Sequence, residues 1–581
     1  MNTIARMMVL AASAMAVAPH ASAQNKTQQQ IYEEFKKKAQ GDYQSFRKKA
    51  NEEYAKFLKK AWTTYEAVAP RKKPVEKDVK PVLWTKEDEK KLLNKSLVSR
   101  EIPVLSFNMP RPTLPQPQPL EIIVPTEVSR VPVVKPLQIG PVKLPDYLKN
   151  IKVPVQPEEP TTQEPTAPEP PAPTPTTTPT PSIPEPPVVV APTTEPPVIS
   201  QEEPTTPVED VKPDSRYVVF NTFGTECRVR FEDRDFSFGG KLTGDGLSAA
   251  WTKFAGSEMD NTLYDCLQIR KQLHLSDWAY YLMLKSFAEK CFGKSNEATF
   301  LHAYLYCQSG YKMRLGRSGD KLYLLVGSKH IIYGKMFHYV GGEDFYSFDS
   351  KEPRLQICDV GFPKEQPMSL YISDEQLFAD NPTPVREIKS KRYKDMSFKV
   401  SVNKNLLDFF DTYPASEIEG NPLSTWEMYA RNPLASSVKA QLYPAIMEHI
   451  KGLSQADAVN KLLNWVQTGF EYEYDDKVWG HDRAFFAEES LYYPYCDCED
   501  RSILLSHLVR ELIGLDVVLV YYPGHLASAV AFTEDVKGDY ISYNGKKFVI
   551  CDGTYIGAPL GMTMPGMDNQ KAKVILLEAA R

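Results

Sequence analysis

Three residues whose side chains can carry out nucleophilic chemistry follow one another at equal steps near the C-terminal end of the chain. Cys498, His525 and Asp552 are spaced 27 residues apart, since 525 − 498 and 552 − 525 both give 27. A thiolate is a nucleophile, an imidazole can take up and return its proton, and a carboxylate can orient the imidazole. In this order the residues predict thiol-dependent acyl transfer, with Cys498 as nucleophile, His525 as base and acid, and Asp552 as the orienting group.

The stretch YCDCEDRSILLSHLVRELIG, residues 495–514, predicts a buried helix that begins at Cys498. Asp497 can cap this helix, Asp500 stands three residues later as in a capping box, and Gly514 is a natural stop. Unpaired amides and the dipole at a helix N-terminus favour a thiolate, so the pKa of Cys498 is expected to be lowered. Cys496 stands in the preceding loop and is expected to receive much less of this field.

Each of these residues also has an ordinary structural interpretation. A lone cysteine is most often a small buried apolar residue, a lone histidine an ordinary hydrogen-bonded one, and an Asp before Gly-Thr a turn former. Cys496 and Cys498 are also close enough in sequence to form a local disulfide or a redox switch. The chain has eight cysteines, and their pairing cannot be read from the sequence.

Strands are expected to carry the histidine and the aspartate. GHLASAVAF predicts a strand, and its alternation puts His525 on one face with Ala527, Ala529 and Ala531. Because that face lacks bulk, the helix end is expected to approach the imidazole there. Asn544-Gly545 predicts a hairpin. On its second arm Asp552 shares a face with Phe548 and Ile550, whereas Cys551 points the other way and is expected to be structural.

Together these segments resemble the core of the transglutaminase-like superfamily, which includes papain-related cysteine proteases and amidases. The resemblance is carried by CDCEDRSILLSHLVRELIGLDVVLV, PGHLASAVAF and FVICDGTYIGAPLG, and it covers roughly residues 450–565. It implies an α+β fold in which the helix that bears Cys498 packs on an antiparallel sheet that bears His525 and Asp552. It also implies the same three catalytic roles. One departure is Leu526, which stands where the family often has an aromatic residue.

The loop EYEYDDKVWGHDRAFFAEESLYYP connects the preceding helix to Cys498. Its aromatic and charged residues suit a wall over the cleft, with Trp479 and Tyr495 as substrate contacts. Four of its residues, Asp475, Asp476, His481 and Asp482, have side chains that can hold calcium. Their spacing matches no known metal loop, so loop salt bridges are the favoured interpretation. The sequence therefore predicts no metal site and no cofactor.

An earlier stretch, KSNEATFLHAYLYCQSGYKMRL, aligns with the segment around Cys498 with one residue of slippage. Asn296 then falls at the position of Cys498. We expect residues 213–400 to form a mixed, β-rich module that is a degenerate transglutaminase-like copy without a nucleophile. The alternative is a chance similarity between two amphipathic helices.

The N-terminal part repeats aromatic residues every 11 positions, with tyrosines at 32, 43, 54 and 65 and phenylalanines at 35, 46 and 57. Eleven residues make about three helical turns, so the aromatics are expected on one stripe of a long helix, alone or in a loose coiled coil. The other face is Lys-rich. It is interpreted as the solvated face of a spacer helix, with a cell-envelope partner as the alternative.

The expected organisation has five parts: residues 1–23 a signal peptide, 24–73 the repeat helix, 74–212 a disordered Pro-rich linker, 213–400 the mixed module and 401–581 the catalytic domain. The whole linker is interpreted as a spacer, with docking of its more apolar first part, such as LSFNMPRPTLPQPQPLEIIVP, as the alternative. Arg6, the apolar run after it and the small residues Ala21–Ala23 are typical of an export signal. The mature chain is therefore expected to be periplasmic or secreted.

The remaining expectations concern partners. A net charge of −5 gives no reason to expect nucleic acid, and no later segment is apolar over the length of a transmembrane span. The expected partner is a peptide or protein substrate, with a cysteine peptidase, amidase or transglutaminase as the activity. The rival class is a non-catalytic envelope protein that uses the same fold for binding.

Overall fold

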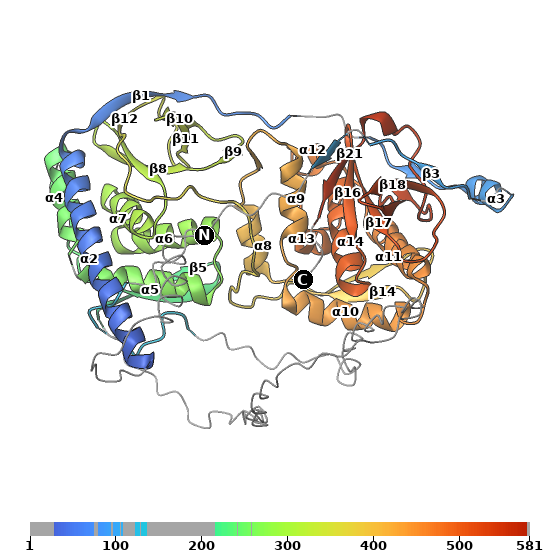
Figure 1. Ribbon diagram of the computed structural model, residues 1–581, viewed down its shortest axis with the longest axis horizontal. Helices are drawn as coiled ribbons and strands as arrows, with labels where there is room; N and C mark the ends of the chain where they lie inside the picture. The colour runs from blue at the N-terminus through green and yellow to red at the C-terminus, as the bar shows by residue number, and fades with distance from the viewer. Residues whose placement is uncertain are drawn as a thin grey trace, which may run out of the picture.

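The computed structural model describes residues 28–74, 79–94, 97–104, 106–108, 123–127, 129–135, 215–240, 242–256 and 258–577. These residues form two units of mixed helix and antiparallel sheet, which lie side by side in Figure 1. This confirms the α+β class. The expected signal peptide and the most proline-dense part of the linker lie outside the described residues. Among the residues described, no helix is both long enough and apolar enough to cross a membrane.

The first unit combines the N-terminal helix with residues up to about 358. Its helices are α2 (Gln28–Lys60), α4 (Gly244–Phe254), α5 (Glu258–Gln272), α6 (Asp277–Phe292) and α7 (Asn296–Gln308). Its strands are β1 (Trp62–Val68), β5 (Tyr217–Thr222), β6 (Thr225–Arg230), β7 (Met313–Ser318), β8 (Lys321–Gly327), β9 (His330–Ile332), β10 (Phe337–Val340), β11 (Glu343–Tyr346) and β12 (Arg354–Cys358). Six of these strands close into a barrel in the order β1-β10-β11-β8-β7-β12.

A connecting region joins the units through β13 (Arg386–Lys389), β14 (Ser397–Val400), α8 (Lys404–Asp411) and β15 (Ser416–Ile418). Helix α8 contacts both sides. Its Phe409 ring lies 5.4 Å from that of Phe223 in the first unit, and its Phe410 ring stacks at 4.1 Å on Phe486 in the second. One continuous apolar core therefore extends through both units.

The second unit holds the predicted site. Its helices are α9 (Leu423–Arg431), α10 (Ser436–Ile450), α11 (Gln455–Gly469), α12 (Asp475–Val478), α13 (Ala487–Tyr492), α14 (Cys498–Leu512) and the 3₁₀ turn η3 (Asn569–Lys571). Its strands are β16 (Val517–Tyr522), β17 (His525–Ala531), β18 (Asp539–Tyr543), β19 (Lys546–Cys551), β20 (Tyr555–Ile556) and β21 (Lys573–Leu576). Asn544 and Gly545 form the predicted hairpin turn between β18 and β19, both with positive φ.

The two units repeat one order of elements. In the second, helix α14 packs on a sheet in which five antiparallel strands run β18-β19-β17-β16-β21. In the first, helix α7 packs on strands that run β10-β11-β8-β7-β12. In each unit the chain visits these strands in the same sequence after the helix. The degenerate copy stays a prediction, and this shared order supports it over chance similarity of two helices.

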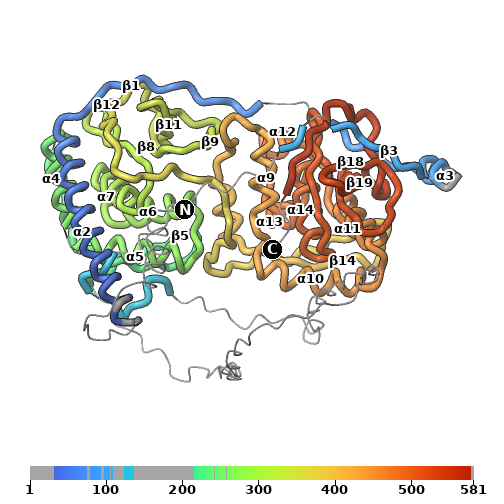
Figure 2. The backbone as a smooth tube through the Cα atoms, in the orientation of Figure 1, coloured from blue at the N-terminus to red at the C-terminus, as the bar shows by residue number. Residues whose placement is uncertain are grey.

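The N-terminal chain passes from one unit to the other (Figure 2). Beyond β1 it adds β2 (Val82–Leu83), α3 (Lys86–Asn94), β3 (Arg100–Glu101) and β4 (Ser106–Asn108). Strand β3 pairs with β18 and β4 pairs with β21, so this segment supplies both edges of the seven-stranded sheet. Ile102, with 2 % of its surface exposed, lies in the core of that sheet.

This docking corrects the expectation that all of residues 74–212 is a disordered linker. Short apolar pieces between prolines can pair at a sheet edge, where a missing N–H on the outer side costs no ladder hydrogen bond. Further along, Val133 and Val134 are buried in the core of the first unit. The interpretation of residues 74–212 as a spacer stays a prediction only for those of them that lie outside the described residues.

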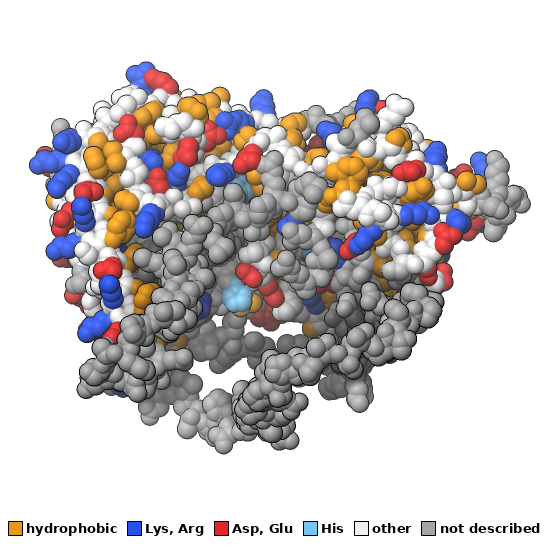
Figure 3. All heavy atoms as spheres, in the orientation of Figure 1, with side chains coloured by type: hydrophobic (Ala, Val, Ile, Leu, Met, Phe, Trp, Pro, Cys, Tyr) orange, Lys and Arg blue, Asp and Glu red, His pale blue; other side chains and the backbone are white. Residues whose placement is uncertain are grey.

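The structure confirms the predicted long helix as α2, but this helix packs against the rest of the first unit and does not stand alone. It ends at Lys60, and residues 62–68 form strand β1, so Tyr65 leaves the helical repeat. The helix packs along α4, where Tyr54 is 2 % exposed and its ring lies 4.6 Å from that of Trp251. Phe46 and Phe57 remain 38 % exposed. Figure 3 shows apolar side chains among lysines along this edge of the molecule.

Candidate active site

The predicted histidine and aspartate meet. His525 begins β17, Asp552 directly follows β19, and the two strands are antiparallel neighbours. His525 Nε2 lies 2.9 Å from Asp552 Oδ2, and both residues are 3 % exposed. The other ring nitrogen, Nδ1, is buried and has no hydrogen-bond partner. The arrangement orients the imidazole and leaves Nδ1 as the nitrogen available for proton transfer.

The Asp552 carboxylate is itself held by the turn that follows it. Its Oδ1 accepts hydrogen bonds from the backbone amides of Thr554 at 2.8 Å and Tyr555 at 3.2 Å. The ordinary interpretation of this residue as a turn former is therefore also correct. One carboxylate oxygen forms the turn and the other holds the histidine, so the two interpretations describe the same side chain.

Two residues that the sequence analysis did not single out fix the loop that carries Asp552. Gln467 Nε2 donates to the carbonyl oxygens of Asp552, Tyr555 and Ala558 at 2.9–3.1 Å. Arg501, fully buried on α14, donates to the carbonyl oxygen of Gly553 at 3.3 Å and to that of Gln467 at 3.0 Å. The available signals were weak: Gln467 directly follows the apolar Trp465 and Val466, and Arg501 is a charged residue in the first turn of a helix expected to be buried.

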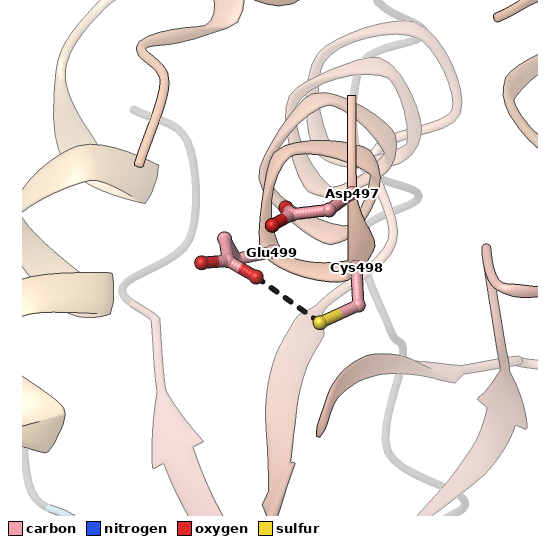
Figure 4. Close-up of side chains that lie close together, drawn as sticks. All are labelled: Asp497, Cys498 and Glu499. Atoms are coloured by element: carbon pink, nitrogen blue, oxygen red, sulfur yellow. Dashed lines mark hydrogen bonds between the residues drawn. The ribbon is translucent and has the colours of Figure 1, made fainter. Parts of the chain in front are cut away.

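Cys498 is the first residue of α14, as predicted, and Asp497 and Asp500 form the expected capping box before it. Its thiol donates to Glu499 Oε2 at 3.0 Å (Figure 4). The backbone amide of Leu526, the residue after His525, lies close enough to the sulfur to oppose the rise in its pKa. Among the residues that the structure describes, no hydrogen bond joins this sulfur to the imidazole.

The expectation of a lowered thiol pKa is wrong for this arrangement. Burial, followed by the charges of Glu499 and Asp497, raises the pKa of Cys498 well above its usual value. The helix dipole acts with only about half a charge, and burial together with the neighbouring carboxyl groups of Glu499 and Asp497 outweighs it. The sequence analysis treated these acidic neighbours as capping residues and did not count their field on the thiol.

The predicted approach of the helix to the alanine face of β17 is also wrong. Ser502 of α14 donates to the Leu526 carbonyl at 2.9 Å, and Ser528 of β17 donates to the Ser502 carbonyl at 3.2 Å. Leu526 belongs to the core that includes α14, whereas Ala527 and Ala529 belong to a separate core on the other sheet face. Helix and strand approach closely because of paired serines and not because of alanines.

All eight cysteines are free. Cys496 is buried in the loop before α14, and burial raises the pKa of its thiol to about 11. Cys551 is fully buried on β19, as expected for a structural residue. The local disulfide between Cys496 and Cys498 is therefore not formed, and the proposed nucleophile carries a free thiol.

Trp479 and Tyr495 lie in the loop around α12 and α13. The Trp479 ring packs 4.8 Å from Tyr493 and under the Arg483 guanidinium, at 4.6 Å. Tyr495 forms a single bridge with Glu471 beside the start of α14. Their assignment as substrate contacts stays a prediction.

The acidic loop residues behave differently from one another. Asp482 forms an ion pair with Lys73 at 2.8 Å, in line with the salt-bridge interpretation. Asp475 is buried and accepts a hydrogen bond from the Arg483 amide at 2.6 Å. Burial and the Glu499 charge raise the pKa of Asp475 to about 8.

Asp476 is exposed, and the exposed His481 contacts the Trp479 carbonyl. The four therefore do not form one site.

No family model, curated protein or solved structure matches this chain. The resemblance to the transglutaminase-like superfamily consequently stays a prediction from sequence motifs. The structure shows a mixed fold of helix and antiparallel sheet and a buried His525–Asp552 pair. Cys498 stands at the start of α14, beside the backbone amide of Leu526, the residue that follows this histidine on β17.

Proposed function

We propose that this protein is a thiol-dependent acyl-transfer enzyme of the transglutaminase-like type, exported by the cell, that acts on a peptide or carboxamide. The observation that carries the proposal is the His525–Asp552 pair at 2.9 Å, buried and oriented through Nε2, with the cysteine of the neighbouring helix start beside Leu526. A buried imidazole held by a turn-anchored carboxylate is suited to proton transfer more than to fold stability alone.

In the proposed reaction Cys498 Sγ forms a bond to the carbonyl carbon and the bond from that carbon to the leaving amine breaks. The thiol proton passes to His525 Nδ1 and then to the amine. Water, or a second amine, attacks the resulting thioester, releases the acyl group and returns the proton to the thiol. Backbone amides at the start of α14 would stabilise the oxyanion. Hydrolysis is favoured because water is abundant.

The closed state of the site must open for this chemistry. Cys498 is 5 % exposed, and its thiol donates a hydrogen bond to Glu499 and none to the His525 imidazole. Substrate binding would therefore have to release the sulfur from Glu499 and admit a carbonyl group. Catalytic hydrogen bonds often tighten only when substrate is present.

The same observations favour a second candidate, a non-catalytic binding or envelope-organising protein. A buried thiol with a raised pKa, bonded to a carboxylate, is what an inactive remnant of such a site would show. The exposed Phe46 and Phe57 on the lysine-rich α2 give this candidate a surface for an envelope partner.

Acylation by an activated ester separates the two candidates. The full chain is incubated with p-nitrophenyl acetate, and intact mass and peptide mapping locate the adduct. The enzyme gives one acetyl group on Cys498, lost in Cys498→Ala and strongly reduced in His525→Ala. Cys496→Ala, two residues away, is the matched control and keeps the adduct. Equal, slow acetylation of several residues, unchanged in His525→Ala, would support the binding protein.

A further inference from the structure

One side of helix α2 is left uncovered by the rest of the protein. The helix runs along the outer edge of the first unit (Figure 1), and its buried side, which includes Tyr54, packs against α4. Four aromatic side chains of the helix remain in contact with solvent: Tyr32 is 58 % exposed, Phe35 39 %, and Phe46 and Phe57 38 % each. Exposed apolar side chains that are grouped and rimmed by polar residues mark an interaction surface, whereas single ones do not.

The three phenylalanines form one straight row. They recur every 11 residues, which is close to three helical turns, so they stay on one stripe of the helix and stand about 16 Å apart. Phe46 is the middle member, and Lys364 Nζ lies 4.8 Å from the centre of its ring. A long, straight apolar row of this kind is suited to contact with a second helix.

Charged residues accompany the row, and they alternate in sign. Lys38 and Lys49 each stand three residues after a phenylalanine, and Asp42 and Glu53 each stand seven residues after one. Residues three or seven positions apart share one side of a helix, so the order along this face is phenylalanine, lysine, acid, and then the same again. All four charged residues are exposed, and in the described part of the chain none of them takes part in an ion pair.

The alternation of sign favours one occupant for this face. An anionic lipid surface or polymer carries one sign of charge, so Asp42 and Glu53 would repel it. An antiparallel second copy of α2 presents the same pattern in reverse. If Phe46 lies opposite Phe46 of the second copy, then Lys49 comes beside Asp42 of that copy, and Lys38 comes beside Glu53 of that copy. Each charge on the face therefore meets its opposite.

We propose that two copies of this chain associate through α2, antiparallel about a two-fold axis at Phe46. Phe35 of each copy packs against Phe57 of the other, and the charged residues form four ion pairs along one flank. A two-fold interface must be complementary to itself, and this face is. A parallel pair in register would set each charged residue level with its own copy and would form none of these ion pairs.

Charge reversal tests the proposal on the full chain, with sedimentation velocity over a series of concentrations. Lys49→Glu and Asp42→Lys each turn two attractive contacts of the dimer into repulsive ones. Each variant alone should therefore raise the dimer Kd by about tenfold or more. A mixture of the two variants should form dimers of about wild-type affinity, because in the mixed dimer the two reversed charges face each other and the second pair is the native one.

Lys48→Glu is the matched control, with the same change of charge at the next residue. Lys48 is exposed but stands two residues after Phe46, which puts it on the opposite side of the helix from the row. The dimer Kd should stay at the wild-type value. Phe46→Glu places two carboxylates at the two-fold axis and should leave the chain monomeric, and because this ring is at the surface its circular dichroism spectrum should match that of the wild type.

Three results would overturn the proposal. The first is a wild-type chain that is monomeric throughout the concentration series. The second is a dimer that Lys48→Glu weakens as much as Lys49→Glu does, since this would be a general effect of charge. The third is a mixture of Lys49→Glu and Asp42→Lys that does not associate.

A monomeric chain that sediments with phosphatidylglycerol vesicles, and loses this in Lys49→Glu, would assign the face to a membrane and would also overturn the proposal. None of these measurements involves acylation of Cys498. The failure of this inference and that of the proposed function are therefore separately visible.

Discussion

The side-chain oxygen of Asn296 accepts a hydrogen bond from the backbone amide of Leu322 at 2.9 Å. Asn296 is the first residue of α7, and Leu322 is the second residue of β8. In the other unit the amide of Leu526, the second residue of β17, lies beside the sulfur of Cys498, the first residue of α14. Asparagine thus stands in the first unit where the cysteine stands in the second, and makes the corresponding contact.

Replacing Asn296 should therefore loosen the first unit without creating or removing any reactivity. Asn296→Ala removes the bond to Leu322 and the donation to the Asp320 carbonyl at 2.7 Å, so stability should fall by about 1–2 kcal/mol. Urea unfolding measures the loss, and acetylation of Cys498 should continue at the wild-type rate. A loss of acetylation with stability unchanged would contradict a purely structural role.

Asp552→Asn tests the orienting carboxylate. The asparagine oxygen can still accept the Thr554 and Tyr555 amides, so the fold should persist. Its amide group, however, would donate to His525 Nε2 and place the ring proton on Nδ1, which then cannot accept the thiol proton. Acetylation of Cys498 should slow by about 10³–10⁴-fold. Exposed Asp568→Asn is the control, and a similar slowing there would argue for a general charge effect.

Gln467→Leu tests the residue that positions the Asp552 loop. It leaves three buried carbonyl oxygens without their donor, and each such group costs about 1–3 kcal/mol. We expect a loss of at least about 2 kcal/mol in urea unfolding and slower acetylation of Cys498. Gln455→Leu, at the half-buried start of the same helix, removes the acceptor of the Thr533 amide and hydroxyl and should cost no more than about 1 kcal/mol. Equal losses in the two variants would rule out a special role for Gln467.

Local sequence signals predicted local structure well. The capping pair Asp497 and Asp500 located the start of α14, and strand alternation together with Asn544-Gly545 put Asp552 where it meets His525. Each of these relationships depends on residues within one helix, or within the three successive strands β17, β18 and β19.

Tertiary contacts account for what the sequence analysis missed. The raised pKa of Cys498 depends on how deeply its surroundings bury it and on carboxylates whose side-chain directions the sequence does not reveal. The edge strands β3 and β4 are only two and three residues long, below the length at which alternation can be recognised. Their partners, β18 and β21, lie more than 400 residues later in the chain.

The edge strands lead to a prediction about the second unit by itself. A fragment of residues 401–581 lacks β3 and β4, so β18 and β21 would be open edges beside an uncovered apolar core. Such edges promote association with other chains. We expect the fragment to aggregate in size-exclusion chromatography, and a peptide of residues 97–108 to reduce this. A scrambled peptide should have no effect, and a monomeric, stable fragment would contradict the assignment of these strands to the domain.

Buried histidines should make the first unit sensitive to acid. Burial, with a smaller contribution from Lys285, lowers the pKa of His302 from 6.5 to about 3. Between these values the unfolded chain binds a proton that the folded chain does not, so stability falls as the pH drops below about 6.5. The slope is about 1.4 kcal/mol per pH unit for each such group. His330, whose pKa burial lowers to about 3, adds to the same loss.

His302→Phe isolates one proton of this effect, because phenylalanine keeps the ring that packs 4.5 Å from Tyr281 and cannot be protonated. From pH 6 to pH 4 the variant should lose less stability than the wild type, by about 1.4 kcal/mol per unit, in urea unfolding at each pH. From pH 7 to pH 8 the imidazole is neutral in both states, so the difference between the two proteins should stay constant and serves as the internal control. Parallel pH profiles down to pH 4 would show that the His302 site takes up its proton without unfolding.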